Sequence, residues 1–272
     1  MKSYAKSSRP AAPLDVPLSP PTESAGMISP LVKDIPHDER LVLPLDVTSF
    51  DEAKRLVDDF GDVVKFYKLG LELLLAGGGF TGEFMGMVDW LANRGKKVLA
   101  DIKIFDIPRT VGAALRQLRD GNVTFVTVHG NDEILRAAVA EKGDVKVLAV
   151  TVLTSLDQGD LADLGFQVDV ERLVLSRAKR ALEIGCDGVI SSGMEAAALR
   201  ESLGENFLIL CPGVRPLEKT EEDDQKRTVD LEEAFRNGAD YVIVGRPIRH
   251  APDPLGAAKE IQRRIRDFFS VT

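Results

Sequence analysis

The sequence of 272 residues contains only two cysteines, Cys186 and Cys211, and they do not form a CxxC pair. Cysteines this few and this far apart supply neither a disulfide framework nor a zinc site, and they are typical of a protein from a reducing cytosol. The three histidines, His37, His129 and His250, are too dispersed to suggest a metal-ligand set, and no HExxH motif occurs. We therefore expect a cytoplasmic protein without a bound metal.

Long apolar runs are also missing, since no stretch of the chain approaches the roughly 18–20 residues that a membrane span needs. Acidic residues outnumber basic ones, 43 against 35, and the net charge of −8 argues against a broad nucleic-acid-binding surface. Hydrophobic residues make up 44% of the chain and charged residues 29%, which is ordinary for a globular protein. We expect no membrane and no nucleic-acid partner.

Proline is unevenly distributed, because half of the 14 prolines lie within residues 1–36. This stretch holds one aromatic residue, Tyr4, and too few apolar residues to offset the entropy of ordering it. It lacks the apolar region of a secretory signal. We interpret residues 1–36 as a disordered tail and residues 37–272 as one folded domain. A docking or targeting arm is the alternative interpretation of the tail.

From residue 41 onward, short apolar runs alternate with amphipathic segments. The apolar runs are nearly continuous, which is typical of strands buried on both faces of a parallel sheet. The predicted strands are 41–47, 63–70, 96–104, 123–130, 145–153, 187–193, 206–214 and 240–248. The predicted helices are 49–60, 80–93, 110–120, 131–141, 170–184, 194–203, 230–237 and 255–269.

Eight strand–helix units in about 230 residues predict an α/β fold of the (β/α)8 type, a TIM barrel, as a single domain. A doubly wound sheet is the main competitor, although no GxGxxG motif follows the first predicted strand. Pro44 lies inside that strand even though proline cannot donate to a ladder, and we expect a bulge there.

Charged residues lie at the carboxyl ends of the first three predicted strands. In TIM barrels these ends form one rim, where the chemistry gathers. Asp46, Lys68, Asp101 and Lys103 all fall on this rim. Asp101 and Lys103 are two residues apart, so their side chains point to the same face of a regular strand. Because burying charge is costly unless it is paired, we expect the four to alternate in sign.

Two further residues near the rim have more than one interpretation. Asp106 follows the third strand and lies just before Pro108, which opens a predicted helix. A helix N-cap is a frequent role for aspartate, so both a cap and a site residue remain open. His129 ends an apolar strand, where a hydrogen-bonded core histidine is more common than a catalytic one.

The last two predicted strands end in glycine and arginine, at Gly213 and Arg215 and at Gly245 and Arg246. Glycine lets backbone N–H groups approach phosphate oxygens, and arginine offers two parallel donors. TIM barrels commonly bind phosphate at the loops after strands 7 and 8. The sequence therefore predicts a phosphate site on an otherwise acidic domain.

Five motifs occur in the order of a known family: DIKIFDIPRT (101–110), LTS (153–155), PGVRP (212–216), DQKR (224–227) and VGRPI (244–248). With them, residues 40–270 resemble the orotidine 5′-phosphate decarboxylases of the bacterial homodimeric type. The resemblance implies decarboxylation of orotidine 5′-monophosphate (OMP) to UMP and CO2, the last step of de novo pyrimidine biosynthesis. It also implies that no cofactor takes part.

The resemblance further implies a role for each residue at the rim. Lys103 is expected to be the general acid that protonates C6, and Asp101 to lie beside the substrate carboxylate. Lys68 and Asp46 complete the charge array and hold ribose hydroxyls. The other implied substrate contacts are Thr154, Ser155, Pro212, Arg215, Gln225, Gly245 and Arg246.

A homodimer is implied as the catalytic unit, because Asp106, Ile107 and Thr110 are expected to reach the neighbouring subunit's site. Residues 216–228 are expected to form a lid over the bound nucleotide, with Gln225 bridging its base and phosphate.

The residues alone leave two other functions open. Related barrels that carry DxKxxD use a magnesium-bound sugar phosphate, as in hexulose-phosphate synthase and ketogulonate-phosphate decarboxylase. The LTS and PGVRP motifs and Gln225 favour the nucleotide enzyme over these. A catalytically silent nucleotide-binding barrel is the second alternative. The intact set of charged rim residues disfavours it: Asp46, Lys68, Asp101, Lys103 and Asp106.

Overall fold

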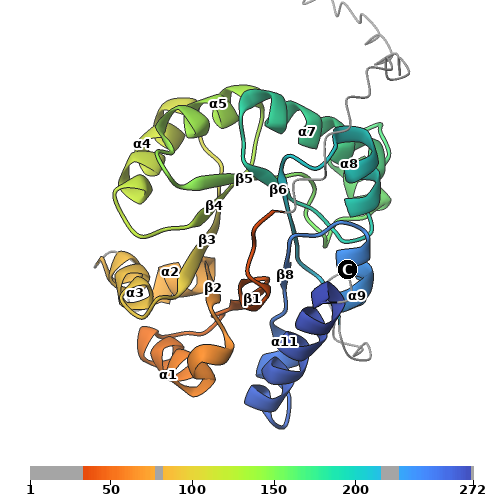
Figure 1. Ribbon diagram of the computed structural model, residues 1–272. Coiled ribbons are helices and arrows are strands. Elements are labelled where there is room, and N and C mark those ends of the chain that lie inside the picture. Colours follow the sequence, from red (N-terminus) through yellow and green to blue (C-terminus); the bar gives the residue numbers. More distant parts are fainter. Residues whose placement is uncertain (1–32, 77–81, 216–226, 271–272) are drawn as a thin grey trace, which may run out of the picture. The chain divides into compact units, whose positions relative to one another are not determined.

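The computed structural model describes residues 33–76, 82–215 and 227–270. Eight parallel strands form a closed barrel in chain order, and helices surround it (Figure 1). The barrel closes where β1 pairs with β8, Leu41 opposite Val242. This closure confirms the predicted TIM barrel and excludes the doubly wound sheet, whose edge strands would be unpaired.

The strands are shorter than predicted, mainly at their carboxyl ends. They are β1 (Leu41–Pro44), β2 (Phe66–Gly70), β3 (Lys97–Ile104), β4 (Phe125–Val128), β5 (Lys146–Val150), β6 (Gly188–Ile190), β7 (Leu208–Cys211) and β8 (Tyr241–Ile243). The apolar pattern continues past the last ladder hydrogen bond, because the residues that follow still line the barrel mouth. Those residues carry much of the candidate site.

The helices agree with the predicted ones, with additions too short to show an amphipathic period. They are α1 (Phe50–Phe60), α2 (Leu71–Leu75), α3 (Glu83–Ala92), α4 (Pro108–Arg119), α5 (Asp132–Glu141), α6 (Gln158–Asp163), α7 (Val170–Ile184), α8 (Ala196–Leu203), α9 (Leu231–Arg236), α10 (Arg246–Arg249) and α11 (Pro254–Ser270), with 3₁₀ turns η1 (His37–Glu39) and η2 (Gly61–Val63). The additions are α2, α6, α10 and the two turns. In the described part of the chain, no helix has the length and apolar character needed to cross a membrane.

Several helix starts are fixed by side-chain caps. Ser49, Asn131 and Asp169 each accept a hydrogen bond from the backbone N–H three residues on. Such caps satisfy amide groups that have no partner within the helix. At the other end of α7, Gly185 takes a left-handed conformation with φ 104°, a conformation that glycine adopts at little cost.

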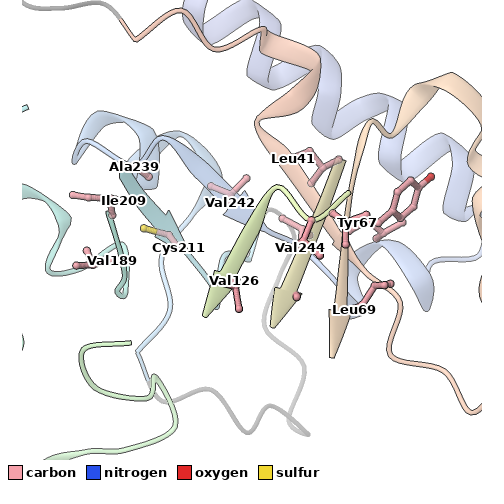
Figure 2. Close-up of a cluster of buried hydrophobic side chains, with 14 of the residues drawn as sticks. Leu41, Tyr67, Leu69, Val126, Val189, Ile209, Cys211, Ala239, Val242 and Val244 are labelled. Atoms are coloured by element: carbon pink, nitrogen blue, oxygen red, sulfur yellow. The ribbon is translucent and has the colours of Figure 1, made fainter. Parts of the chain in front are cut away.

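The strands separate two hydrophobic clusters, because successive side chains point to opposite faces. The outer cluster fills the space between the barrel and its helices (Figure 2). The inner cluster fills the lumen, where Phe66, Phe125 and Tyr241 pack with ring centroids 5.1 to 5.7 Å apart. These three are the first residues of β2, β4 and β8, so aromatic rings close the amino end of the barrel.

A short arm before β1 also packs against this end of the barrel. Lys33 donates a 2.7 Å hydrogen bond to Asp240, which also accepts from Arg200 and from the Ile209 amide. Ile35 packs against the inner cluster. Residues 33–36, assigned to the tail from their composition, therefore contact the barrel, through single contacts that leave no periodic pattern. Residues 1–32 lie outside the described residues.

Gly188, the first residue of β6, pairs with Leu208 of β7 and leaves no room for a side chain. A Cβ atom there would lie 2.3 Å from the carbonyl oxygen of Leu208, and backbone atoms cannot move aside as a flexible side chain can. We expect Gly188→Ala to lower the free energy of unfolding by about 1–3 kcal/mol, the usual cost of overpacking. Urea denaturation followed by circular dichroism measures the change.

Gly86→Ala is the matched control, because a Cβ at this exposed helical position meets nothing within 4 Å. Alanine is the better helix former by up to about 1 kcal/mol, so this variant should be more stable than the wild type. Equal effects of the two substitutions would contradict the assignment of Gly188 to steric contact.

Candidate active site

A cavity of about 320 Å³ opens at the carboxyl ends of the strands. Every strand except β4 contributes a residue to its wall, either from the strand itself or from the segment that follows it. The cavity brings together ten of the residues predicted for the site: Asp46, Lys68, Asp101, Lys103, Thr154, Ser155, Pro212, Arg215, Gly245 and Arg246.

Four of these side chains form a continuous chain of alternating charge. The Lys68 ammonium lies 2.9 Å from Asp46 Oδ1 and 3.5 Å from Asp101 Oδ2. The Lys103 ammonium lies 2.9 Å from Asp101 Oδ1. Asp101 is therefore bracketed by two lysines, and Lys68 by two aspartates. We refer to Asp46, Lys68, Asp101 and Lys103 as the charge array.

Asp101 is the buried centre of the charge array, with 9% of its surface exposed. Burial disfavours its charged form, but Lys68, Lys103 and a hydrogen bond from Thr127 outweigh this and hold its pKa below the usual range. The carboxylate is thus ionised at neutral pH, and it fixes both ammonium groups at the cavity wall.

An irregularity in β3 places Lys103. Ala100 pairs with Val126 and Ile104 with Val128, so three residues of β3 oppose the single residue Thr127. Lys103 has φ 45°, and no other described residue besides glycine has a positive φ. Asp101 and Lys103 do lie together, as expected. The expected cause, regular alternation along the strand, is wrong, because a bulge brings them together.

The expected bulge at Pro44 is absent. Pro44 ends β1 in regular register with Lys68, and the next amide, that of Leu45, donates to the Lys68 carbonyl at 2.9 Å. Proline is tolerated here because its own nitrogen is not needed in the ladder. Its ring packs against Gly245, where a Cβ atom would lie 2.7 Å from Pro44 Cγ.

The part of the cavity wall that follows β7 and β8 carries two arginines next to glycines. Arg215 and Arg246 line the wall together with Gly213 and Gly245. Gly213 has φ 75°, a left-handed conformation that suits glycine. Guanidinium groups beside glycine backbone are suited to an anion such as phosphate, since both offer N–H donors. The cavity wall therefore carries two arginines after β7 and β8 and paired charges after β1, on β2 and on β3.

Asp106, Ile107 and Thr110 do not line the cavity of their own chain. All three are exposed on the segment from the end of β3 into α4. Asp106 accepts a 2.6 Å hydrogen bond from the Ile107 amide, but the N-cap residue of α4 is Ile107. The interpretation of Asp106 as a helix N-cap is therefore wrong.

Two other predictions concern residues away from the cavity wall. His129 is half-buried and its ring meets that of Phe105 edge-on at 5.5 Å. Burial, together with the nearby Arg177, lowers its pKa, so this histidine is neutral at neutral pH. Gln225 and residues 216–226 of the predicted lid lie outside the described residues.

Arg227 and Glu195 form a buried ion pair that sequence reasoning missed. Arg227 also donates to the carbonyls of Val152 and Leu153, at 3.1 and 2.9 Å. Burial raises the pKa of Glu195 in spite of the Arg227 cation. Arg227 thus links Glu195, which follows β6, to the backbone that follows β5, directly before Thr154. The pair therefore supports the part of the cavity wall that contains Thr154. Arg227 belongs to the DQKR motif, and this motif was the sign in the sequence that could have pointed to Arg227.

A TIM barrel whose cavity wall carries paired lysines and aspartates together with a Gly–Arg pair defines a class, the phosphate-binding barrel enzymes. A family model described as "Orotidine 5'-phosphate decarboxylase / HUMPS family" matches residues 39–261. The chain belongs to this family, as its motifs indicated.

Curated relatives and a solved structure agree with this assignment. The orotidine 5'-phosphate decarboxylase of Methylococcus capsulatus is 55% identical over 238 residues, covering 88% of this chain and 96% of that protein. The enzyme of Xanthomonas euvesicatoria is 48% identical over 230 residues, covering 84% of this chain and 92% of its own. The crystal structure of the Lactobacillus acidophilus enzyme has a TM-score of 0.71 at 30% identity and covers 84% of this chain and 99% of that one.

The lowered pKa of Asp101 predicts a pH-dependent contribution to stability. A carboxyl whose pKa is lower in the folded state stabilises the fold above its unfolded pKa of about 3.9, and the contribution disappears as the pH falls through the folded value. We expect Asp101→Asn to lower the free energy of unfolding by about 3 kcal/mol near neutral pH, because both lysines lose their buried partner. The difference from the wild type should shrink below about pH 4.

Urea denaturation between pH 7 and pH 3 measures this difference. Asp120→Asn is the control, because Asp120 is exposed and pairs only loosely with Arg119, at 3.6 Å. Its effect should stay within about 0.5 kcal/mol at every pH. A stability loss in Asp101→Asn that is constant across the range would contradict the assignment.

Proposed function

We propose that the charge array and the two arginines are the two ends of one substrate site, in which the chain converts OMP to UMP and CO2. This activity, a carboxy-lyase step of pyrimidine biosynthesis, is that of the family to which the chain belongs. The observation that carries the proposal for this site is that both ends line a single cavity of about 320 Å³. A nucleotide whose reacting carboxylate and phosphate lie at opposite ends has the matching arrangement of charge.

The reaction requires stabilisation of a carbanion. Loss of CO2 from C6 leaves an electron pair in the plane of the pyrimidine ring, where no conjugated carbonyl can accept it. A fixed ammonium group beside C6 stabilises this charge as it develops and needs no reorganisation when the bond breaks. We assign this role to Lys103, which donates a proton to C6 as CO2 leaves.

The other members of the charge array hold the ammonium in place. Asp101 accepts a 2.9 Å hydrogen bond from Lys103 and faces Lys68 at 3.5 Å. Lys68 in turn donates to Asp46 at 2.9 Å. In the proposed site Asp101 lies beside the substrate carboxylate, while Lys68 and Asp46 also bind ribose hydroxyls.

The phosphate and the base occupy the rest of the cavity. Arg215, Gly245 and Arg246 bind the phosphate, while Thr154, Ser155 and Pro212 contact the pyrimidine. Binding energy from the remote phosphate lowers the barrier at C6 when it is used to hold the reacting group in place. The contact of Gln225 with base and phosphate, and closure by residues 216–228, stay predictions.

The catalytic unit is proposed to be a homodimer. Large apolar side chains are exposed around the segments that follow β2 and β3: Leu71 at 52%, Leu75 at 67%, Phe105 at 67% and Ile107 at 65%. Such exposure near one rim favours a protein partner over solvent. A second copy of the chain covering this face would receive Asp106, Ile107 and Thr110 at its own site.

The direct test is the spectrophotometric loss of OMP in excess chelator. The decarboxylase should turn over fully under these conditions, whereas the magnesium-dependent sugar-phosphate enzymes of related barrels should be inactive. A protein that binds UMP but never consumes OMP would instead match the silent nucleotide-binding barrel.

We expect Lys103→Ala to lower kcat for OMP by more than about 1,000-fold, because the group that stabilises and protonates the carbanion is gone. Binding of UMP, measured by calorimetry, should persist because the phosphate end is intact. Lys97→Ala is the control, since Lys97 lies at the start of the same strand and pairs with Glu39 away from the cavity. Substantial activity in Lys103→Ala would overturn the proposed role of this lysine.

Mixing Lys103→Ala with Asp106→Ala protein tests the shared site. Each variant alone should be nearly inactive. After subunit exchange, about a quarter of the sites should be intact, because half of the dimers are mixed and each holds one complete site. The rate of OMP loss measures the recovery. No recovery, although native mass spectrometry shows mixed dimers, would contradict the sharing of Asp106.

A further inference from the structure

We propose that Thr127, a residue outside the cavity wall, is a positioning residue for the decarboxylation that holds Lys103 and Asp101 in their reactive arrangement. The proposal rests on the roles given above to these two residues. Thr127 lies in β4, the one strand that contributes nothing to the cavity wall. Its side chain is fully buried, with 0% of its surface exposed.

The hydroxyl of Thr127 makes two hydrogen bonds, one to each partner. Its oxygen accepts from the Lys103 amide at 2.9 Å and donates to Asp101 Oδ1 at 3.0 Å. Asp101 Oδ1 is also the atom that accepts from the Lys103 ammonium, at 2.9 Å. Thr127 thus completes a closed ring from the lysine backbone, through the carboxylate, to the lysine ammonium.

The bulge explains why a hydroxyl is needed at this position. Three β3 residues oppose Thr127, so the Lys103 amide has no ladder carbonyl opposite it. A buried amide without an acceptor is costly, and the threonine oxygen supplies one. A hydroxyl accepts and donates at the same time, which an aliphatic side chain of the same shape does not.

The same contact maintains an unfavourable backbone conformation. Lys103 has φ 45°, and a left-handed residue other than glycine costs of order 1 kcal/mol or more unless its surroundings hold it. Without the Thr127 acceptor, the backbone is free to relax toward ordinary strand geometry. Relaxation would turn the ammonium away from C6 and leave the phosphate end of the site unchanged.

Thr127→Val removes both hydrogen bonds and keeps the shape of the side chain. Since a displacement of about 1 Å at a reacting group costs on the order of 100-fold in rate, we expect kcat for OMP to fall about 10- to 100-fold. KM should change less than about twofold, because the arginines that bind the phosphate are untouched. Thr127→Ser keeps the hydroxyl and should restore kcat to within about threefold of the wild type.

Thr124→Val is the matched control. Thr124 lies just before the same strand, and its hydroxyl accepts from the Val98 amide of β3 at 3.3 Å, near the amino end of the barrel. It makes the same kind of contact between the same two strands, away from the charge array. Its kcat and KM should match those of the wild type.

The pH profile of kcat distinguishes a positioning role of Thr127 from a purely structural one, because a purely structural role would leave the profile unchanged. Thr127→Val deprives the Asp101 carboxylate of a hydrogen-bond donor, so the pKa of Asp101 should rise and the acid limb of the profile should move to higher pH. Thr124→Val should leave the limb in place. Unchanged kcat and an unmoved limb in Thr127→Val would overturn the proposal.

Two further outcomes keep the test decisive. If Thr127→Ser is as impaired as Thr127→Val, the methyl group and not the hydroxyl matters, and the proposal is wrong. If Thr127→Val does not fold, Thr127→Ala takes its place, and wild-type kcat in that variant would overturn the proposal. Activity in Lys103→Ala would instead remove the proposed function itself, whatever the Thr127 variants show.

Discussion

The structure around the cavity depends on one constraint, the presence of an ionised carboxylate, Asp101, in a place with little water. A buried charge persists only when opposite charges and hydrogen bonds surround it. Lys68 and Lys103 supply the charge, and the register between the strands pairs Gly70, the last residue of β2, with Asp101 of β3. Gly70 ends β2 for a related reason, because a Cβ atom there would lie 3.0 Å from the Lys68 ammonium and 3.3 Å from Asp46.

The two ends of the barrel serve different purposes: the amino end contributes to stability, and the carboxyl end carries the candidate site. At the amino end, aromatic rings and Ile35 fill the lumen, and Asp240 accepts hydrogen bonds from buried donors. At the carboxyl end, the charge array is held at the mouth, and the lumen below it is packed with aliphatic side chains. The ammonium of Lys103 therefore faces the cavity on a rigid base, which is the condition for stabilising charge without reorganisation.

The sequence predicted the barrel from strand period and chain order, and it predicted the charge array and the Gly–Arg pairs from the residues at the carboxyl ends of the strands. It did not predict the bulge that brings Asp101 and Lys103 together. Thr127 was not predicted, since it lies within an apolar run and acts only through a bulge that a period of two residues does not reveal. Ion pairs such as Arg227 with Glu195 join segments far apart in the chain, so spacing carries no sign of them. The role proposed for the exposed segment from Asp106 to Thr110 came from the resemblance alone, because it involves a second chain and the spacing within one chain carries no sign of that.

The charges on the cavity wall bear on how the proposed site lowers the barrier of the reaction. Among the described residues its wall carries four cations, Lys68, Lys103, Arg215 and Arg246, against Asp46 and Asp101, a formal charge of +2 on a chain with a net charge of −8. A phosphate monoester carries about −2 near neutral pH, and the carboxylate of OMP adds one further negative charge, which the proposed site places beside Asp101. Because the proton that reaches C6 comes from Lys103 as neutral CO2 leaves, the summed charge of cavity and ligand does not change. What changes in the proposed site is the position of the negative charge, which moves from the carboxylate beside Asp101 to C6 beside the Lys103 ammonium. The arrangement thus favours the charge distribution that develops as the bond breaks over that of the bound substrate, through the placement of its charges and not through their sum, as a site that lowers a barrier requires.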